Sequence, residues 1–587
     1  MKKLLTVLTL LSLPSLAVAD TVVDLTKRYL DGLFAAKPHL ATFMGDHRFD
    51  GKLPDVSDQA VKQRIAALVG QEREAAALAK KKMSDDDQID AAILRDGIAL
   101  ELLYLREIRD WEWDPRLYDS FPYYDPREIV AGRLSDIVHG DFAPEAERLK
   151  YVESQLEALP KFLADMQVAL ERASRGKGRR TPKVYVEAGI RDNKGRIEFF
   201  ESEVKAFTKN SPTAEKARVA AIVALQKYQK FLVDDLAKRA DGDWRLGAAL
   251  YRKKFPLALG TDVKPDEVIA RAEKSFASTK LELLQVSREL ATEMALPKLG
   301  KETDAQLTTR VKDELAKNHP KPAELLAAHA QHLDEMRAFI EAHNLLALPP
   351  RDTLRVEAMP EFKRGSSAAE YLAPGVLDRR PAWHATYYVD PIDSTWPADR
   401  VESYLRGQNN YEVQLVATHE AYPGHHTQYF YSKRNLNPLR AVLWNAAFVE
   451  GWAVYGEGQM VANGYGGKDT KRFRFYDLRG RMVVATNILL DIKLQSGQMS
   501  DEEAVRFMVE EGFQEKAMAE KKLLRAKLDS TQLAQYFLGL DEILALERDY
   551  KKQVGDKWNQ RQFNESLIGH GSIGVKFLRR YLLAAVK

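Results

Sequence analysis

Cysteine is absent from the 587-residue chain. This absence excludes disulfide scaffolds, thiol catalysis and thiolate-ligated metal sites, and it suits an oxidising compartment. An excess of one charge is also lacking, because 88 Lys and Arg stand against 85 Asp and Glu, interspersed along the chain, for a formal net charge of +3. Without a concentrated field of one sign, we expect no nucleic-acid partner and no binding to an anionic membrane.

Long apolar runs are absent beyond the N-terminus, so we expect no membrane-spanning helix. The N-terminus itself has two lysines, a short apolar run from Leu4 to Leu13, and an A-x-A pattern at 17–19. That order is typical of a secretory signal peptide and predicts cleavage after Ala19, with export to the periplasm or the medium. No cysteine follows the apolar run, so we expect a soluble exported protein rather than a lipid-anchored lipoprotein.

Strand signals are sparse, whereas apolar residues recur three and four apart through most of the chain. The helices expected from this spacing cover residues 61–82, 86–109, 145–175, 214–239, 265–294, 321–347, 439–462 and 472–495. Two short segments, 353–359 and 385–390, combine β-branched and aromatic residues and are expected to form a small sheet. The sequence therefore predicts an all-α protein, mainly helical with a very small β-sheet.

The most informative segment is 419–426, which reads HEAYPGHH. Three of the 12 histidines lie within these eight positions, beside Glu420. Imidazole nitrogen suits zinc, and a carboxylate next to a ligand is placed to take a proton from metal-bound water. In the standard H-E-x-x-H motif the two histidines share one helix face, but here the second position holds Pro423, which cannot ligate.

Pro423 bears on which histidine joins His419 at the metal. On a regular helix His425 lies about 240° round from His419, and His426 is nearly in phase but about 10 Å further along the axis. Proline lacks an N–H and its ring clashes with the carbonyl four residues back, so we expect the helix to open here and bring His425 to the metal. We favour His425 as the ligand and place His426 behind the ligands or facing substrate.

A third ligand is expected from the segment Phe448–Glu457, on the next predicted helix. Glu450 lies 25 residues (450 − 425) after His425, which allows a helix to return to the metal. Glu457 lies two turns further on the same face, so it is expected outside the ligand set. We therefore expect one Zn²⁺ ion.

These residues resemble the signature of the bacterial DUF885 family, HExxPGHxxQ followed by VEGWAxYxE, which reads HEAYPGHHTQ and VEGWAVYGE here. The likeness extends from Pro38, Thr42, Gly45 and His47 to residues 563–571. It implies a divergent gluzincin metallopeptidase with a large helical, neurolysin-like fold around a central cleft, similar to thimet oligopeptidase and angiotensin-converting enzyme.

The resemblance also implies roles for individual residues. It makes His419, His425 and Glu450 zinc ligands and Glu420 the general base, although the family commonly has a histidine at position 426 as well. The chain departs from the family at Gln495 and Asn564, where a histidine is common. We expect residues 20–345 to form an N-terminal helical lobe and residues 346–587 a metal-binding catalytic lobe of the same continuous fold.

Further residues are candidates for roles around the metal. Tyr536 and His570, which lies between two glycines, are candidate donors to the oxyanion of a tetrahedral intermediate. Arg481 and Arg525 are candidates to bind a substrate carboxylate. Tyr387 lies in the expected strand 385–390, which would hold an extended peptide if it formed a sheet edge.

Together these features predict a zinc-dependent metallopeptidase that hydrolyses short peptides. Two alternatives are a metallohydrolase acting on non-peptide amides and a non-catalytic exported binding protein with a structural metal. A structural zinc site usually closes all four positions and often uses cysteine, whereas here three candidate ligands stand beside a ready base. We therefore favour the enzyme.

Overall fold

The computed structural model describes residues 21–121, 127–176, 178–297, 299–359, 368–380 and 383–584. The expected signal peptide, residues 1–19, lies outside them. The described chain is mainly helical, and its strands form only two small sheets. The prediction of an all-α fold with a very small β-sheet is confirmed.

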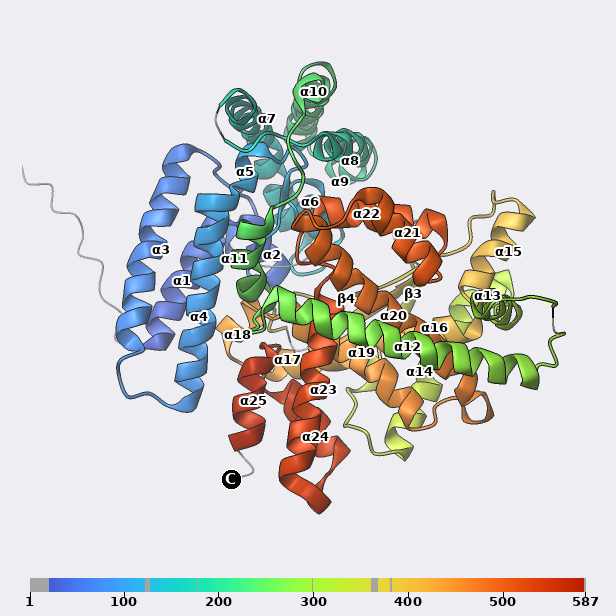
Figure 1. Cartoon of the computed structure of the whole chain (residues 1–587). Helices are drawn as coiled ribbons and strands as arrows, with labels where there is room; N and C mark the ends of the chain where they lie inside the picture. The colour runs from blue at the N-terminus through green and yellow to red at the C-terminus, as the bar shows by residue number, and fades with distance from the viewer. Residues whose placement is uncertain are drawn as a thin grey trace, which may run out of the picture.

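The first half of the chain is almost entirely helical (Figure 1), apart from two short strands at residues 118–119 and 127–128. Its helices are α1 (Val22–Ala36), α2 (Pro38–Met44), α3 (Asp58–Leu78), α4 (Asp85–Leu103), α5 (Asp110–Trp113), α6 (Ala131–His139), α7 (Glu145–Arg175), α8 (Lys183–Glu201), α9 (Glu203–Thr208), α10 (Pro212–Asp234), α11 (Ala248–Leu259), α12 (Pro265–Glu293), α13 (Asp304–Leu315) and α14 (Leu325–Ala342).

The second half begins with strands and returns to helices. Its elements are β3 (Leu354–Ala358), β4 (Ala369–Leu372), β5 (Ala385–Val389), α15 (Ala398–Gly407), α16 (Asn410–Glu420), α17 (His425–Arg434), α18 (Pro438–Val442), α19 (Ala446–Ala462), α20 (Thr470–Gln495), α21 (Asp501–Arg506), η8 (Phe507–Glu511), α22 (Lys516–Leu528), α23 (Gln535–Val554), α24 (Gln560–Gly569) and α25 (Val575–Ala584).

Long, strongly periodic segments form helices close to the predicted bounds, as α7 and α12 do. The predicted helix 439–462 is wrong, because it divides into α18 and α19. The cause is Asn445, whose side chain accepts the backbone N–H of Phe448 and starts a new helix. The predicted helix 321–347 ends early, at α14, because Asn344 is left-handed with φ 50°.

The larger sheet has the strand order β3-β5-β4. Strand β5 is central, parallel to β3 and antiparallel to β4, and Tyr387 on it is fully buried. The condition on which the 385–390 strand would hold a peptide, an exposed sheet edge, is therefore not met, because β3 and β4 already pair with its backbone. The edge toward the motif helix is β4, whose four residues gave no strand signal. A second sheet pairs β1 (Tyr118–Asp119) with β2 (Arg127–Glu128).

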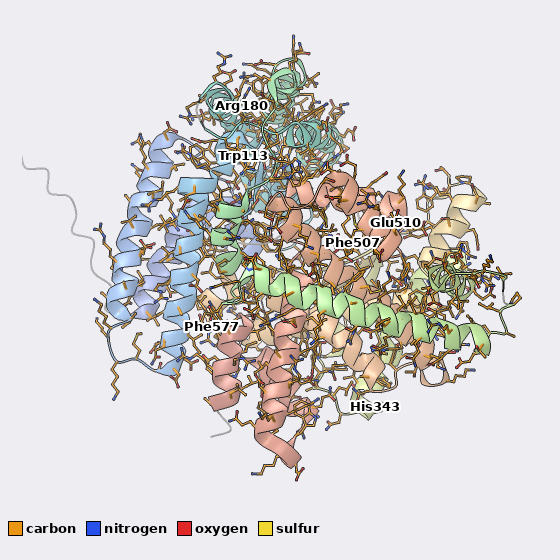
Figure 2. The ribbon with its side chains drawn as sticks, viewed as in Figure 1. Trp113, Arg180, His343, Phe507, Glu510 and Phe577 are labelled. Carbon is orange, nitrogen blue, oxygen red and sulfur yellow. The ribbon has the colours of Figure 1, made fainter. Side chains whose placement is uncertain are left out.

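The helices of the two halves pack into a shared core. Helix α12 crosses in front of α20 in Figure 1, and these two helices make the most extensive contact of the described chain. The ring of Phe507, marked beside α12 in Figure 2, lies 5.2 Å from the ring of Phe276. The largest hydrophobic cluster takes side chains from both sides of residue 345, and a second cluster lies within residues 117–236.

Two glycines set the contact between α19 and α23. A Cβ on Gly451 would lie 2.3 Å from the carbonyl carbon of Gly539, and a Cβ on Gly539 would lie 1.7 Å from the oxygen of Ala447. The backbones of α19 and α23 are therefore in direct contact, which fixes the position of α19 along its axis relative to segment 419–426. Within the described residues, the helices are all too short or too polar to cross a lipid bilayer.

The basic loop at 174–183 ties two parts of the N-terminal region together. The guanidinium of Arg179 lies 4.4 Å from the centre of the Trp113 ring and donates to the carbonyls of Trp244 and Arg245. Figure 2 marks Trp113 and Arg180 at this junction. The side chain of Arg179 is thus occupied by contacts within the protein.

Candidate metal centre

The motif segment folds as two helices joined by a tight turn. Helix α16 ends at Glu420, and α17 begins at His425. The backbone N–H of Gly424 donates to the carbonyl of Thr418 at 3.0 Å, and a Cβ on Gly424 would lie 1.8 Å from the carbonyl oxygen of His419. The helix does open as expected, but it breaks completely, and only glycine permits the close approach.

The turn brings His419 and His425 together. Their ring centroids are 4.7 Å apart and the planes are nearly perpendicular, at 86°. The Nε2 atoms of His419 and His425 lie 3.4 Å and 3.7 Å from Oε2 of Glu450. One ligand atom each of His419, Glu420 and His425 also lies within 4.8 Å of the other two. Two imidazoles and two carboxylates therefore meet in one place.

The spacing of these atoms fits a zinc ion. With zinc bonds of about 2.0–2.1 Å at tetrahedral angles, neighbouring ligand atoms lie about 3.3–3.4 Å apart. The separations of 3.4 Å and 3.7 Å around Glu450 are close to this value. The side chains of His419 and His425 are 17% and 15% exposed, so the cluster is open to solvent on one side. His419, His425 and Glu450 could hold one ion with a position left for water.

Helix α19 carries Glu450 to the turn and is fastened there. The indole Nε1 of Trp452 donates to the carbonyl of Pro423 at 3.0 Å, and a Cβ on Gly456 would lie 3.1 Å from the Pro423 ring. Trp452 and Gly456 of the VEGWAVYGE segment thus have structural roles. They dock α19 so closely on the turn that Glu450 and Glu457 face His419.

Glu457 lies behind His419, as expected, and outside the group of Nε2 and Oε2 atoms. Its Oε1 is 2.7 Å from Nδ1 of His419. Burial acts to lower the pKa of His419, but the carboxylates of Glu450 and Glu457 outweigh it and raise that pKa well above the usual value. Burial raises the pKa of Glu457. The site is thus rich in negative charge, which a cation would offset.

Glu420, at the end of α16, is held by the edge strand. Burial raises the pKa of its carboxyl to about 7, and the neighbouring His419 opposes this shift. The backbone N–H of Tyr371, on β4, donates a hydrogen bond to the carboxylate. A carboxyl that titrates near neutrality suits a group that takes and returns a proton. The sequence had no signal for this donor, because it is a backbone group on a strand of four residues.

His426 points away from the cluster. It is fully buried, with Nε2 3.1 Å from Oγ1 of Thr353 and Nδ1 3.2 Å from the hydroxyl of Tyr371. Burial lowers the pKa of His426 to about 3, so its ring is neutral. Both nitrogens are therefore occupied by neighbouring side chains, and of the two adjacent histidines it is His425 that faces Glu450.

Three further candidates, Arg525, Tyr536 and Arg481, make contacts with neighbouring residues of the chain. Nη2 of Arg525 donates to the hydroxyl of Tyr536 at 3.3 Å, so the structure brings these two together. Arg481 lies beside Gly458, the residue that follows Glu457. Its guanidinium packs on Gly458 and donates to Asp477 at 3.0 Å.

The contacts of the His570 ring do not bring it to the cluster, and its catalytic role stays a prediction. The ring stacks on Tyr581 with centroids 4.1 Å apart. The next residue, Gly571, lies beside Asn435, which follows the C-terminal end of α17. Ser572, two residues after His570, accepts from Nε2 of Gln428 on α17. The flanking glycines mark a tight turn.

The two positions that depart from the family pattern have structural partners. Nε2 of Gln495 donates to the carbonyls of Ala526 and Asp529, and its Oε1 accepts the N–H of Leu246. Asn564 donates to the carbonyl of Leu345. Neither side chain contacts His419, His425 or Glu450.

Comparison with known proteins gives one family and a shared fold. Residues 38–582 match the family described as "Bacterial protein of unknown function (DUF885)". No curated protein matches the chain. One similar solved structure is "a putative lipoprotein of unknown function from Shewanella oneidensis", with 25% identity, a TM-score of 0.82, and coverage of 96% of this chain and 100% of that one. Another is "the putative lipoprotein from Colwellia psychrerythraea", with 17% identity, a TM-score of 0.76, and coverage of 96% and 98%.

Proposed function

This chain belongs to the DUF885 family of bacterial proteins, and we propose that it is a zinc-dependent metallopeptidase that hydrolyses short peptides. The observation that carries the proposal is the convergence of Nε2 of His419, Nε2 of His425 and Oε2 of Glu450 at 3.4 Å and 3.7 Å, with the Glu420 carboxyl beside them. Two histidines and a carboxylate are a common ligand set of catalytic zinc.

A neighbouring carboxylate already orients one of the proposed metal ligands. Glu457 holds Nδ1 of His419, so that Nε2 is turned toward Glu450. A carboxylate behind a ligand histidine fixes the orientation of the ring and raises its basicity. When bound, zinc would supply Lewis acidity toward a substrate carbonyl and lower the pKa of water.

Glu420 is the proposed general base. Its carboxyl lies within the cluster, is buried, and has its pKa raised to about 7. In hydrolysis it would take a proton from the attacking water and return it to the leaving amine, so one group serves both steps. The N–H of Tyr371 donates to this carboxylate.

Cleavage of defined peptides tests this proposal. The mature protein, loaded with one equivalent of zinc, is incubated with a mixture of short peptides and analysed by mass spectrometry. We expect cleavage that stops with a chelator and returns with zinc. In Glu420→Gln, zinc binding should persist while kcat falls by about 10²–10⁴-fold, the usual contribution of a general base.

A matched control is Glu412→Gln. Glu412 is an acid on the same helix, with a pKa also raised by burial, and its ion-pair partner is Arg479. It should retain most of the wild-type rate. Zinc binding without cleavage of any peptide would contradict the peptidase proposal, and testing of simple amides would then separate a non-peptide amidase from a structural metal.

We also propose that the protein is exported to the periplasm or the medium. The signal-peptide pattern ending at Ala19 supports export, and the descriptions of both similar structures read "putative lipoprotein". The mass of the protein recovered from the periplasmic fraction should match a chain that begins at Asp20. A full-length mass in the cytoplasm alone would contradict export.

A further inference from the structure

One face of α17 holds the edge strand of the sheet. His426, Tyr429 and Lys433 stand at positions i, i+3 and i+7, so their side chains share a face of the helix. The hydroxyl of Tyr429 donates to the carbonyl of Pro374, and Nζ of Lys433 donates to the carbonyl of Asp378 at 2.6 Å. Both carbonyls belong to the segment that follows β4. These three side chains therefore attach β4 and the segment after it to α17, the helix that begins with His425.

The donor and the acceptor can be assigned in each hydrogen bond of His426. The hydroxyl of Thr353 donates to the carbonyl of Pro350 at 2.6 Å, so Oγ1 is the acceptor in its contact with His426. Nε2 of His426 is then the donor, and in a neutral ring Nδ1 must accept. The hydroxyl of Tyr371 donates to it. His426 thus links Thr353, just before β3, to Tyr371 on β4.

Tyr371 connects this link to Glu420. The N–H of Asp390 donates to the carbonyl of Ala368, so alternate residues of β4 from Ala368 turn their backbone groups toward β5. Tyr371 belongs to the alternate set of residues, whose backbone groups face away from β5. Its N–H therefore points out of the sheet and donates to Glu420. The side chain of Tyr371 is held by His426 while its backbone holds Glu420.

We propose that His426 is a positioning residue: it anchors strand β4 to α17 so that the Tyr371 N–H holds the Glu420 carboxylate in place. The inference rests on the proposed function, which gives Glu420 its proton transfer. It assigns the second histidine of the PGHH sequence a task distinct from that of His425. Tyr429 and Lys433 share this task by holding the chain that follows β4.

The effect on catalysis follows from the connection. Loss of the anchor lets β4 move away from α16, so Glu420 loses a fixed donor and samples more orientations. The metal ligands are on α16, α17 and α19 and keep their places. We therefore expect a lower kcat with little change in KM and none in zinc stoichiometry.

Two substitutions of His426 separate its two bonds. His426→Asn places its amide near the position of Nδ1 and keeps a bond to Tyr371, whereas His426→Gln reaches the position of Nε2 and keeps the bond to Thr353. Backbone amide exchange of residues 368–380 is measured in the zinc-loaded protein and in the metal-free protein, alongside kcat, KM and zinc content. In His426→Gln, we expect exchange to speed up and kcat to fall by about five- to tenfold, the equivalent of one buried hydrogen bond, while His426→Asn restores most of both.

Helix α17 also offers a matched control pair. Tyr429→Phe removes the bond to the chain after β4, whereas Tyr431→Phe removes the bond from the same helix to the carbonyl of Ala347. Only Tyr429→Phe should speed exchange in residues 368–380. Equal exchange in all four variants and the wild type would overturn the proposal, as would equal loss of kcat in His426→Asn and His426→Gln.

Amide exchange also keeps the two proposals apart. If the wild type cleaves no peptide, the proposed function fails, yet exchange in β4 still tests the anchor. If the wild type cleaves peptides but amide exchange in β4 is the same in the His426 variants and the wild type, the positioning role of His426 is refuted and the peptidase proposal is retained.

Discussion

Oε1 of Glu457 lies 2.7 Å from Nδ1 of His419, while Nε2 of the same ring lies 3.4 Å from Oε2 of Glu450. One imidazole is thus held between two carboxylates that come from the same helix, seven residues apart. The relation explains why the VEGWAVYGE segment carries two acids two turns apart. One faces the position of a metal, and the other fixes the ring that would bind it.

Glu457→Gln should therefore weaken zinc binding although Glu457 is not a ligand. The amide retains a weaker bond to His419 but no longer supplies charge to the ring. Loss of such a supporting carboxylate typically costs about 10–100-fold in metal affinity. Titration with zinc by calorimetry would measure the change, with Glu412→Gln as the charge-matched control. Equal affinity in Glu457→Gln and the wild type would remove Glu457 from the site.

Gly424 tests the turn that builds the motif. In Gly424→Ala the new Cβ would meet the carbonyl oxygen of His419 at 1.8 Å, so the turn must open and His425 must move. Overpacking of this kind costs about 1–3 kcal/mol in the free energy of unfolding, and zinc affinity should fall with it. Denaturant unfolding and zinc titration measure both effects.

Gly195 is the matched control for that substitution. It lies within α8 with no atom inside 4 Å of a built Cβ. Gly195→Ala should stabilise the protein by about 0.4–1 kcal/mol, since alanine restricts the unfolded chain. If both variants lost stability equally, the crowding at Gly424 would not be the cause.

The sequence predicted the parts of this protein that depend on local chemistry. Periodicity over many turns placed α7 and α12 within a residue or so of their bounds. The motif identified His419, Glu420, His425 and Glu450 because their chemical types are rare in combination. Helix ends that depend on a single capping residue were harder to predict from the sequence. Asn445, for example, divides one predicted helix into two.

What the sequence could not predict depends on contacts between distant segments. Strand β4 is stabilised by pairing with β5 and by α17, not by its own four residues. Its position makes β5 central, which reverses the role predicted for Tyr387. His570 lies between glycines as a site residue often does, yet its ring stacks on Tyr581, which is on α25.

Tyr536 and His570 can be told apart by experiment. Tyr536 stays a candidate donor to the oxyanion, since its hydroxyl is paired with Arg525. Tyr536→Phe should lower kcat by about 10²–10³-fold if it is such a donor, with zinc affinity unchanged. His570→Ala should leave kcat/KM close to the wild-type value, because the ring stacks on Tyr581. Steady-state kinetics on one peptide decides both, and a normal rate in Tyr536→Phe would remove its role.

Glu542 gives a prediction about stability and pH that does not involve the metal. Burial raises the pKa of its carboxyl to about 7, against the opposing hydrogen bond from Thr261. In the unfolded chain a glutamate has a pKa of about 4.3. Between these values the folded protein binds more protons than the unfolded one, so this group lowers stability as pH rises from about 4 to 7.

Glu542→Gln should remove this dependence and keep an acceptor for the Thr261 hydroxyl. Below pH 4 both forms carry a neutral group, and their Tm values should be similar. As the pH rises to 8, the wild type must keep a charge in a buried position, so the variant should become the more stable of the two. Thermal unfolding at pH 4, 6 and 8 measures the gap. A gap that stays constant with pH, or that closes as pH rises, would show that the Glu542 carboxyl titrates normally in the folded protein.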